Sequence, residues 1–177
     1  VKLLGRTRKD IKIITEYAKV TWAVEADQSQ MIQVFWNLFV NASQAMPDGG
    51  SVFITTEQYT LEKIDSRFRD AAPGKYMKFS IRDTGIGMNE ETISRAFDPF
   101  FTTKEKERGT GLGLASVYGI IKNHNGFIDL QSEEGRGTVI TVLLPATDKA
   151  PVSDEEDEKS ISRGTGTVLL VDDEAMI

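Results

Sequence analysis

Four amide side chains share one face of a helix that the sequence predicts up to about residue 46: Gln33, Asn37, Asn41 and Gln44. Apolar residues fill most of the other positions, which indicates that much of this helix is buried. Because buried amides need hydrogen-bond partners, two interpretations stay open. The amides cap nearby backbone groups, or they face a ligand such as Mg²⁺, which binds through oxygen donors.

A second candidate site follows a predicted strand and reads Asp83-Thr84-Gly85-Ile86-Gly87-Met88. The two glycines let the backbone turn, or let it approach another group closely. The carboxylate of Asp83 accepts two hydrogen bonds, for instance from an exocyclic amine. Taken alone, the segment fits a plain Asx turn better than a ligand site.

A third candidate is the loop that enters the next predicted helix, Gly109-Thr110-Gly111-Leu112-Gly113-Leu114. Exposed N–H groups at the start of a helix bind phosphate. The spacing is not the G-x-G-x-x-G of dinucleotide-binding folds, and the loop lacks the lysine of a P-loop. The loop therefore either binds phosphate in another fold or is a flexible hinge.

The segment before this loop holds three phenylalanines within five positions and ends on a lysine: Phe97-Asp98-Pro99-Phe100-Phe101-Thr102-Thr103-Lys104. The phenylalanines can anchor a loop on a core or on a partner. The mixed charges at 105–108 are of a kind that is usually solvated. The sharper interpretation is a mobile lid with an apolar latch and a lysine that reaches a phosphate.

Alternating strand and helix signals must position these segments. Asp27 and Gln30 have the spacing of a capping box, which starts the first helix. Strands are predicted near 11–17, 22–24, 51–57, 75–83, 127–131 and 138–144, and helices near 28–46, 92–96 and 112–123. Several neighbouring strands lack a helical crossover, so the sequence predicts an α/β fold with a mixed sheet that is not doubly wound.

The composition excludes several classes of protein. The chain has 177 residues, of which 40% are apolar and 27% are charged, as in an ordinary globular domain. With no cysteine and a single histidine, it has neither disulfides nor a metal site built from clustered Cys or His residues. No apolar run is long enough to span a bilayer, and no signal peptide is visible.

The charge is concentrated in the tail. Residues 148–177 hold nine acidic and three basic side chains, which equals the whole formal net charge of −6. The acidity therefore says little about what the rest of the chain binds. Residues 148–166 have the composition of a flexible linker, and residues 167–177 begin a buried strand that is no domain by itself. We expect the chain to be a piece of a longer protein.

Together and in this order, the motifs resemble the ATP-binding catalytic domain of sensor histidine kinases. That domain belongs to the wider GHKL superfamily, which includes gyrase-type topoisomerases and heat-shock chaperones. QVFWNLFVNASQAM is similar to the N box, DTGIGM to the first glycine box, AFDPFFTTK to the phenylalanine box, GTGLGLA to the second glycine box, and GRGTVITVLLP to the closing strand. The resemblance covers roughly residues 10–145 and implies the Bergerat fold, a two-layer sandwich with helices on one face of the sheet. TVLLVDDE resembles the first strand of a response-regulator receiver domain, which implies a hybrid kinase.

The resemblance also implies roles for individual residues. Asp83 would accept a hydrogen bond from the adenine amine, and Thr138 would support adenine through a water molecule. Asn41 would bind Mg²⁺, and Asn37 would lie near the phosphates. Lys104 and the amides of the second glycine box would hold phosphates as the lid closes. The other implied ATP-binding residues are Gln44, Gly85, Gly87, Thr102, Thr103, Gly109, Thr110, Gly111, Leu112, Gly113 and Leu114.

Two positions depart from relatives of the domain. Hydrolytic members usually have Glu where this chain has Asn37, and an amide is no general base of that kind. Many histidine kinases have Lys where this chain has Gln44, which puts one phosphate contact in doubt. The first departure favours transfer to a protein acceptor over efficient hydrolysis.

The implied function is to bind Mg·ATP and to transfer its γ-phosphate to a histidine on a helical dimerisation domain, in two-component phosphorelay signalling. The alternatives are a hydrolytic ATPase of the same superfamily, and a degenerate module that only binds nucleotide or docks partners. No catalytic residue is assigned, because the phosphoacceptor is absent. The single histidine, His124, is interpreted as a residue at the C-terminus of a helix.

Domain limits and partners follow from the same resemblance. Residues 1–9 would be a remnant of the connection to the helical domain, 10–147 the catalytic domain, 148–166 the linker, and 167–177 the truncated start of a receiver. The expected partners are the helical domain, in cis or in trans, and a receiver domain or response regulator. Neither nucleic acid nor direct membrane contact is expected. We expect a cytoplasmic monomer, from a parent protein with or without a membrane anchor, that does not phosphorylate itself.

Overall fold

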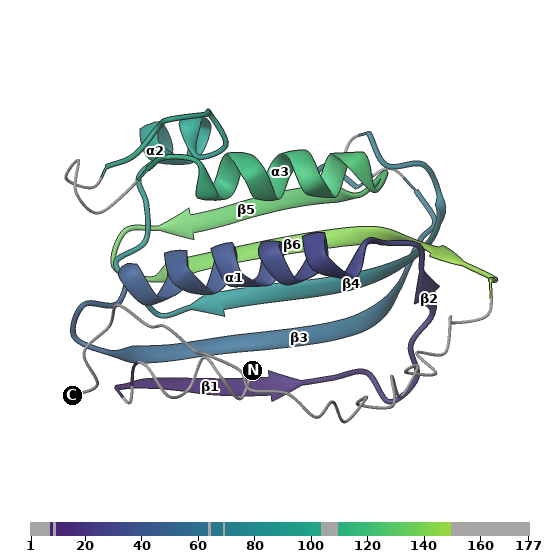
Figure 1. Cartoon of the computed structure of the whole chain (residues 1–177), viewed down its shortest axis with the longest axis horizontal. Coiled ribbons are helices and arrows are strands. Elements are labelled where there is room, and N and C mark those ends of the chain that lie inside the picture. The colour runs from purple at the N-terminus through teal and green to yellow at the C-terminus, as the bar shows by residue number, and fades with distance from the viewer. Residues whose placement is uncertain (1–7, 9, 64, 69, 104–109, 150–177) are drawn as a thin grey trace, which may run out of the picture.

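The computed structural model describes residue 8 and residues 10–63, 65–68, 70–103 and 110–149. Its elements along the chain are β1 (Ile11–Glu16), β2 (Ala23–Val24), α1 (Gln28–Gln44), β3 (Gly50–Leu61), β4 (Gly74–Asp83), α2 (Glu90–Arg95), α3 (Gly113–Asn123), β5 (Phe127–Glu133) and β6 (Gly137–Thr147). Figure 1 shows two layers, with α1 and α3 side by side on one face of the sheet. None of these helices is both long and apolar enough to cross a membrane.

The sheet is mixed, as the sequence predicts. The strand order is β1-β3-β4-β6-β2, and β5 pairs with β6. Strands β1 and β3 are parallel, whereas the other described pairs are antiparallel. The chain passes through β2 and α1 between β1 and β3, which supplies the long crossover that a parallel pair requires.

The main core lies between the sheet and the two long helices. Alternate residues of the strands face the helices, and residues at helical spacing on α1 and α3 face the sheet. Each fully buried aliphatic side chain contributes roughly 1.5–3 kcal/mol relative to exposure. The buried residues that meet here include Val34, Leu38, Ala42, Val52, Ile54, Ile81, Val117, Ile121, Ile140 and Val142.

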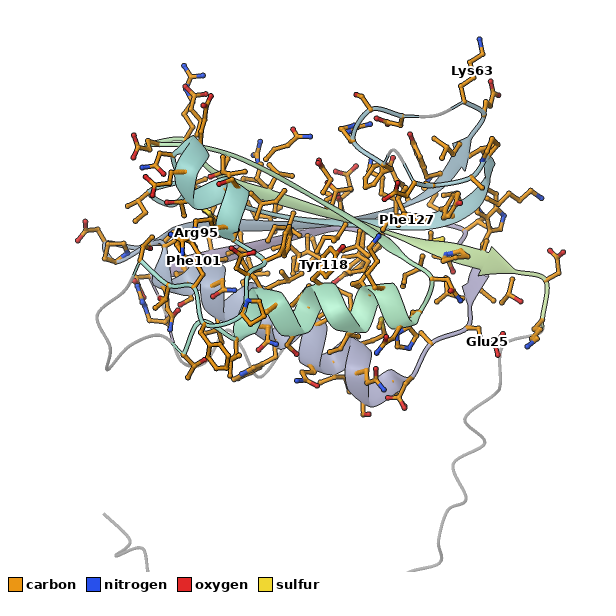
Figure 2. The ribbon with its side chains drawn as sticks, turned by 90° about the horizontal axis from the view of Figure 1, so that it is seen from above. Glu25, Lys63, Arg95, Phe101, Tyr118 and Phe127 are labelled. Atoms are coloured by element: carbon orange, nitrogen blue, oxygen red, sulfur yellow. The ribbon has the colours of Figure 1, made fainter. Side chains whose placement is uncertain are left out.

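A smaller cluster covers part of the opposite face of the sheet. The segment between β3 and β4 buries Phe68 and Ala71 against Leu61, Tyr76 and Leu143. Figure 2 shows this segment, marked by Lys63, on the side of the sheet away from α1 and α3. The strand predicted near 51–57 is longer in the structure, because β3 begins at Gly50 and continues to Leu61. The apolar side chains of this cluster are widely spaced in a polar segment, so no local periodicity predicts it.

Helix α1 begins where the capping box predicts. Asp27 is its N-cap, and its carboxylate accepts hydrogen bonds from the Ser29 hydroxyl at 2.5 Å and from the Gln30 N–H at 2.9 Å. These two donors hold the pKa of Asp27 below its usual range. The N–H of Asp27 itself donates to Nε2 of His124 at 3.0 Å. In a capping box this N–H donates to the side chain three residues later, so here a distant residue supplies that acceptor. The helix ends at Gln44, two residues before the predicted end.

Candidate functional site

Three elements meet at one end of the two-layer structure, on the left in Figure 1. There α1 and β4 end and α3 begins. The two helices are antiparallel, because Gly113 lies beside Asn41 whereas His124 contacts Asp27. Segments far apart in the sequence that were predicted to bind one ligand therefore lie close together.

Asp83 is the buried carboxylate at this end, with a side chain that is only 6% exposed. Its Oδ1 accepts hydrogen bonds from the N–H of Gly85 at 2.8 Å and of Thr138 at 3.3 Å. Its Oδ2 has no hydrogen-bond partner among the described residues. Burial raises the pKa of the Asp83 carboxyl, and the two N–H donors oppose this rise. An ionised Asp83 therefore favours a ligand that donates a hydrogen bond to Oδ2.

A small cavity lies beside Asp83, between α1, the sheet and the start of α3. Its volume is about 30 Å³, which holds roughly one or two water molecules, so a larger ligand must separate its walls. A mostly apolar lining with few polar groups is typical of small-molecule sites. The polar lining is Asn41, Asp83 and Thr138, and the apolar lining is Leu38, Ala42, Ala45, Ile81, Met88, Leu114 and Ile140.

Of the apolar lining, Leu114 was among the predicted site residues, and the other six residues were not. Strand alternation carries a signal for part of it, because Ile81 lies two positions before Asp83, and Ile140 two positions after Thr138. Each pair therefore shares one face of its strand. The contributions of Leu38 and Leu114 depend on how the helices pack, which periodicity alone does not show.

The glycines of the first glycine box are required by neighbouring backbone. A Cβ on Gly85 would lie 2.6 Å from the carbonyl oxygen of Ala45 and 2.8 Å from Oδ1 of Asp83. Gly87 has a φ of +68°, and a Cβ there would overlap the carbonyl group of Glu133. The sequence left open what these glycines approach. Gly85 approaches the end of α1, and Gly87 approaches the β5–β6 turn. This packing fixes the position of the first glycine box beside Asp83.

Asn41 is the amide that most clearly points to a ligand. Its Nδ2 is buried and has no hydrogen-bond partner among the residues that the structure describes. A Cβ on Gly113 would lie 3.5 Å from this Nδ2 and 3.9 Å from Oδ1, so the amide lies beside the start of α3. An unsatisfied buried amide costs roughly 1–3 kcal/mol, and a ligand that pairs with it removes this cost.

The donor set around Asn41 fits Mg²⁺ that arrives with a polyphosphate. In the described part of the chain, no three His, Cys, Asp or Glu side chains are grouped so that they would hold a metal ion. Mg²⁺ commonly keeps several waters and takes one or two protein oxygens together with phosphate oxygens. The single amide oxygen of Asn41 suits that role.

The other amides of the predicted stripe differ in their surroundings. Nε2 of Gln33 donates to Oγ of Ser116 at 3.2 Å and so connects α1 to α3. Asn37 is half-buried one turn before Asn41, and Gln44 is exposed near the end of the helix. The spacing therefore predicts the shared face, but of these four amides Asn41 lines the cavity.

Thr138 lies near the start of β6 and contacts Asp83. Its N–H donates to Asp83, and its Oγ1 lies 2.9 Å from Oγ of Ser132 on β5. The side chain is buried and lines the cavity. No sequence pattern marks Ser132 as a site residue, because its contact with Thr138 is set by the register of the β5–β6 pair.

A backbone hydrogen bond connects the second glycine box to the phenylalanine box. The N–H of Phe100 donates to the carbonyl of Gly111 at 2.9 Å. Gly111 has a φ of +67°, and a Cβ there would overlap the backbone of Phe100. Oγ1 of Thr110 accepts from the N–H of Leu112 at 3.4 Å. Helix α3 begins next, and no side chain caps its N-terminus, which is the arrangement that favours an anion.

Two of the three phenylalanines anchor their loop. The ring of Phe97 lies 5.4 Å from that of Tyr118, and the guanidinium of Arg95 lies 4.3 Å from the ring centre of Phe101 (Figure 2). Phe100 is 75% exposed and has a φ of +67°. Thr102 is half-buried and Thr103 exposed, whereas Lys104 and Gly109 lie outside the described residues. The predicted phosphate contacts of the lid therefore stay predictions.

His124 is the C-cap of α3, as the sequence predicts. Its Nδ1 lies 2.7 Å from the carbonyl oxygen of Ile120, and its Nε2 lies 3.0 Å from the N–H of Asp27. Because a backbone N–H only donates, Nε2 accepts and Nδ1 carries the proton. Nε2 thus connects the end of α3 to the N-cap of α1 at the end opposite to Asp83, whereas Nδ1 bonds within α3.

A sequence profile described as "Histidine kinase-, DNA gyrase B-, and HSP90-like ATPase" matches residues 26–148. The match includes every predicted site residue, from Asn37 to Thr138. The chain belongs to this ATPase family. This family membership explains why the N box, the glycine boxes and the phenylalanine box meet around one cavity.

Curated relatives of this ATPase domain are named as kinases. "Sensor kinase CckA" of Brucella abortus is 42% identical over 176 residues, which cover 94% of this chain and 19% of that protein. "Sporulation kinase E" of Bacillus subtilis is 41% identical over 127 residues, which cover 72% of this chain and 15% of that protein. The chain thus spans about a fifth or less of the length of these relatives.

Solved structures confirm the predicted fold class. The "Mycobacterial sensor histidine kinase MprB" superposes with a TM-score of 0.64 at 26% identity, over 82% of this chain and 88% of that one. The catalytic domain of the histidine kinase ThkA gives 0.63 at 29% identity, over 82% and 90%. Full-length ShkA in complex with AMPPNP gives 0.61 at 26% identity, over 85% and 29%. This ATPase domain is therefore of the histidine kinase type, as found in two-component signalling.

Proposed function

We propose that this histidine kinase ATPase domain binds Mg·ATP where α1, β4 and α3 meet, and transfers the γ-phosphate to a histidine on a helical dimerisation domain. The observation that carries the proposal is one mostly apolar cavity, lined both by a buried carboxylate and by an amide whose buried nitrogen has no partner among the described residues. The acceptor domain would belong to another part of a longer protein or to another subunit.

Adenine would bind against the apolar lining of the cavity. Asp83 would accept from the exocyclic amine through Oδ2, because Oδ1 is already used by two backbone donors. Hydrogen bonds to charged groups contribute about 1.5–3 kcal/mol. Leu38, Ile81 and Ile140 would exclude water from the two faces of the base.

The phosphates would lie at the start of α3. The N–H groups of its first turn would hold phosphate oxygens, since no side chain caps them. Oδ1 of Asn41 would bind Mg²⁺, which neutralises phosphate charge when it is bound. Asn37, Gln44, Thr102, Thr103, Lys104 and Gly109 are proposed to complete the phosphate site.

Transfer would depend on positioning more than on covalent chemistry by this domain. A nitrogen of the acceptor imidazole would attack the γ-phosphorus, and the bond to the bridging oxygen of ADP would break. Asp83 and α3 would hold the two ends of the nucleotide during this displacement. Asn37 cannot act as a general base toward water, which favours a protein acceptor over hydrolysis.

Two other functions compete with this proposal. A hydrolytic ATPase of the same family would turn over ATP steadily without an acceptor. A degenerate module would only dock partners or bind nucleotide. The unpaired Nδ2 of Asn41 argues against docking alone, because a site without ligand would leave this buried group unsatisfied.

Domain organisation belongs to the same proposal. Residues 10–147 would be the catalytic domain, 148–166 a linker and 167–177 the first strand of a receiver, which makes the parent a hybrid kinase with a response regulator downstream. Residues 1–9 would connect to the helical domain. The fragment would be a cytoplasmic monomer.

Calorimetry with Mg·ATP tests the binding part. We expect saturable binding to the full chain, and Asn41→Ala should weaken it because the proposed Mg²⁺ ligand is lost. The matched control is Asn123→Ala, which changes an exposed amide at the far end of α3. Absence of binding at millimolar nucleotide overturns the proposal.

The transfer part needs the acceptor. Incubation of the chain with labelled Mg·ATP alone should yield no phosphoprotein, whereas addition of a histidine-bearing helical domain from a relative should yield an acid-labile product. Steady release of phosphate at the rate of a dedicated ATPase would favour the hydrolytic alternative. An acid-stable product would indicate a serine or threonine acceptor instead.

A further inference from the structure

Ser132 lies next to the cavity without lining it, and it contacts a residue that does. It pairs across the β5–β6 ladder with Thr138, on the face of the sheet that carries the helices. Its Oγ lies 2.9 Å from the carbonyl oxygen of Gly137 and 2.9 Å from Oγ1 of Thr138. No role for Ser132 follows from the boxes described above.

The two contacts of Ser132 fix the direction of the hydrogen bond between the hydroxyls. A carbonyl oxygen can only accept, so the single hydroxyl hydrogen of Ser132 is used on Gly137. Thr138 must therefore donate its own hydrogen to Oγ of Ser132. Toward a ligand, the Thr138 hydroxyl can therefore only accept a hydrogen bond.

The part of the polar lining formed by Asp83 and Thr138 consequently presents acceptors to a ligand. The N–H of Thr138 is used on Oδ1 of Asp83, and Oδ2 of Asp83 is an acceptor without a partner in the described chain. A purine with an amino group at this edge satisfies Oδ2 and Oγ1, directly or through one water molecule. A purine with a carbonyl group there brings another acceptor against them, and unpaired buried polar groups are costly.

We propose that Ser132 is a positioning residue that holds the Thr138 hydroxyl as an acceptor and so favours 6-amino over 6-oxo purine nucleotides. The inference rests on the proposed function, since it places the base of ATP in this cavity. Ser132 acts through Thr138 and does not itself touch the base.

Removal of the Ser132 hydroxyl should release this constraint. In Ser132→Ala the Thr138 hydroxyl has no acceptor on β5 and can rotate toward the cavity. It then donates to a 6-oxo group as readily as it accepts from a 6-amino group. Asp83 still opposes the oxo group, so the preference for ATP should fall in part, on the order of three- to tenfold.

The test is calorimetry on the full chain with Mg·ATP and Mg·ITP, because inosine carries an oxo group where adenine carries an amine. The measured quantity is the dissociation constant for Mg·ITP divided by that for Mg·ATP. The matched control is Ser80→Ala, since Oγ of Ser80 also contacts a threonine on β6, Thr141, at 3.2 Å but on the opposite face of the sheet. Ser80→Ala should leave the ratio unchanged.

Thr138→Val is the second variant, in case Ser132→Ala does not fold. It removes the acceptor itself, so it should lower the ratio, and adding Ser132→Ala to it should change the ratio no further. A wild-type ratio in Thr138→Val overturns the inference. So does an equal loss of affinity for both nucleotides in Ser132→Ala, which indicates a purely structural role.

Failure of the inference can be told apart from failure of the proposed function. If the wild-type chain binds no Mg·ATP, the proposed function fails and the inference falls with it. If the wild-type chain binds Mg·ATP and Ser132→Ala keeps the wild-type ratio, the inference alone fails.

Discussion

At the scale of a single residue, Asp83 is buried by the fold although its proposed function needs a charge. Burial raises its pKa, so the fold favours the protonated carboxyl. A raised folded-state pKa gives a contribution to stability that is full below the unfolded pKa and is lost as the pH rises through the folded pKa. At neutral pH the ionised carboxylate therefore lowers the free energy of unfolding, and a bound amine donor offsets this cost.

Asp83→Asn should separate these two effects. The amide keeps an oxygen for the N–H groups of Gly85 and Thr138 but turns a donor toward the cavity in place of Oδ2. We expect calorimetry to show affinity for Mg·ATP that is roughly 10- to 100-fold weaker. Urea unfolding of the nucleotide-free protein should show higher stability than wild type at pH 7. This gain should shrink as the pH falls through the raised pKa of Asp83 and should end below about pH 4, near the pKa of an unfolded aspartate.

The pH dependence of binding gives a control for the same residue. Because the amine of adenine favours ionised Asp83, affinity for ATP should fall on acidification at a higher pH than an ordinary aspartate would cause. The Asp83→Asn variant shows the titration of the nucleotide alone. Unchanged affinity in that variant at pH 7 would mean that Asp83 does not bind adenine.

At the scale of elements, periodicity predicts which face of each helix or strand is buried. Helix α1 follows from its apolar face and from Asp27, and the sheet follows from alternation, because these patterns are local. Contacts between distant segments are not local. That Gly87 must be glycine depends on Glu133, and the orientation of Thr138 depends on Ser132. The motifs were therefore predictable, whereas Ser132 and the part of the cavity lining that depends on helix packing were not.

Alanine substitutions at two glycines of α3 distinguish the stability of the helix from its proposed contact with phosphate. A Cβ on Gly119 meets nothing within 4 Å, so Gly119→Ala should stabilise the protein by about 0.5–1 kcal/mol and leave ATP binding unchanged. A Cβ on Gly113 makes ordinary contact with Asn41, so the fold accepts Ala there as well. Its methyl group would occupy the space proposed for phosphate and Mg²⁺.

We therefore expect Gly113→Ala to fold and to bind Mg·ATP about tenfold more weakly, a difference of 1.4 kcal/mol. Thermal unfolding and calorimetry on both alanine variants check this pair. Wild-type affinity in Gly113→Ala would show that the ligand does not reach the space between α3 and Asn41.

His124 tests the connection at the other end of the same two helices. His124→Ala removes the acceptor of the Asp27 N–H and the ring contact with Ile120. Water can reach the freed groups, so the expected loss of stability is only about 1 kcal/mol. Affinity for ATP should stay unchanged, because Asp83 and Asn41 lie at the opposite end. Asn123→Ala is the control in urea unfolding, and a large loss of ATP binding in His124→Ala would contradict this separation.

At the scale of the whole molecule, the described elements pack around a core of their own. Strand β6 pairs with β4 and β5 along its length and with β2 at its end, so its backbone is satisfied within this unit. Near that end, Lys149 forms an ion pair with Glu25 at 2.7 Å, with both side chains exposed. Exposed pairs of this kind contribute about 0–1 kcal/mol, so the stability of the unit depends mainly on the core.

A chain that ends at Lys149 should therefore match the full chain in stability and in binding. Residues 150–177 hold eight acidic and two basic side chains, which equals the whole formal net charge of −6. We expect the same unfolding midpoint and the same affinity for Mg·ATP, measured at physiological salt, where charge effects between distant groups are screened. A lower midpoint of the shortened chain at both low and physiological salt would indicate that residues 150–177 pack on this unit. A difference confined to low salt would instead indicate that their charge acts from a distance.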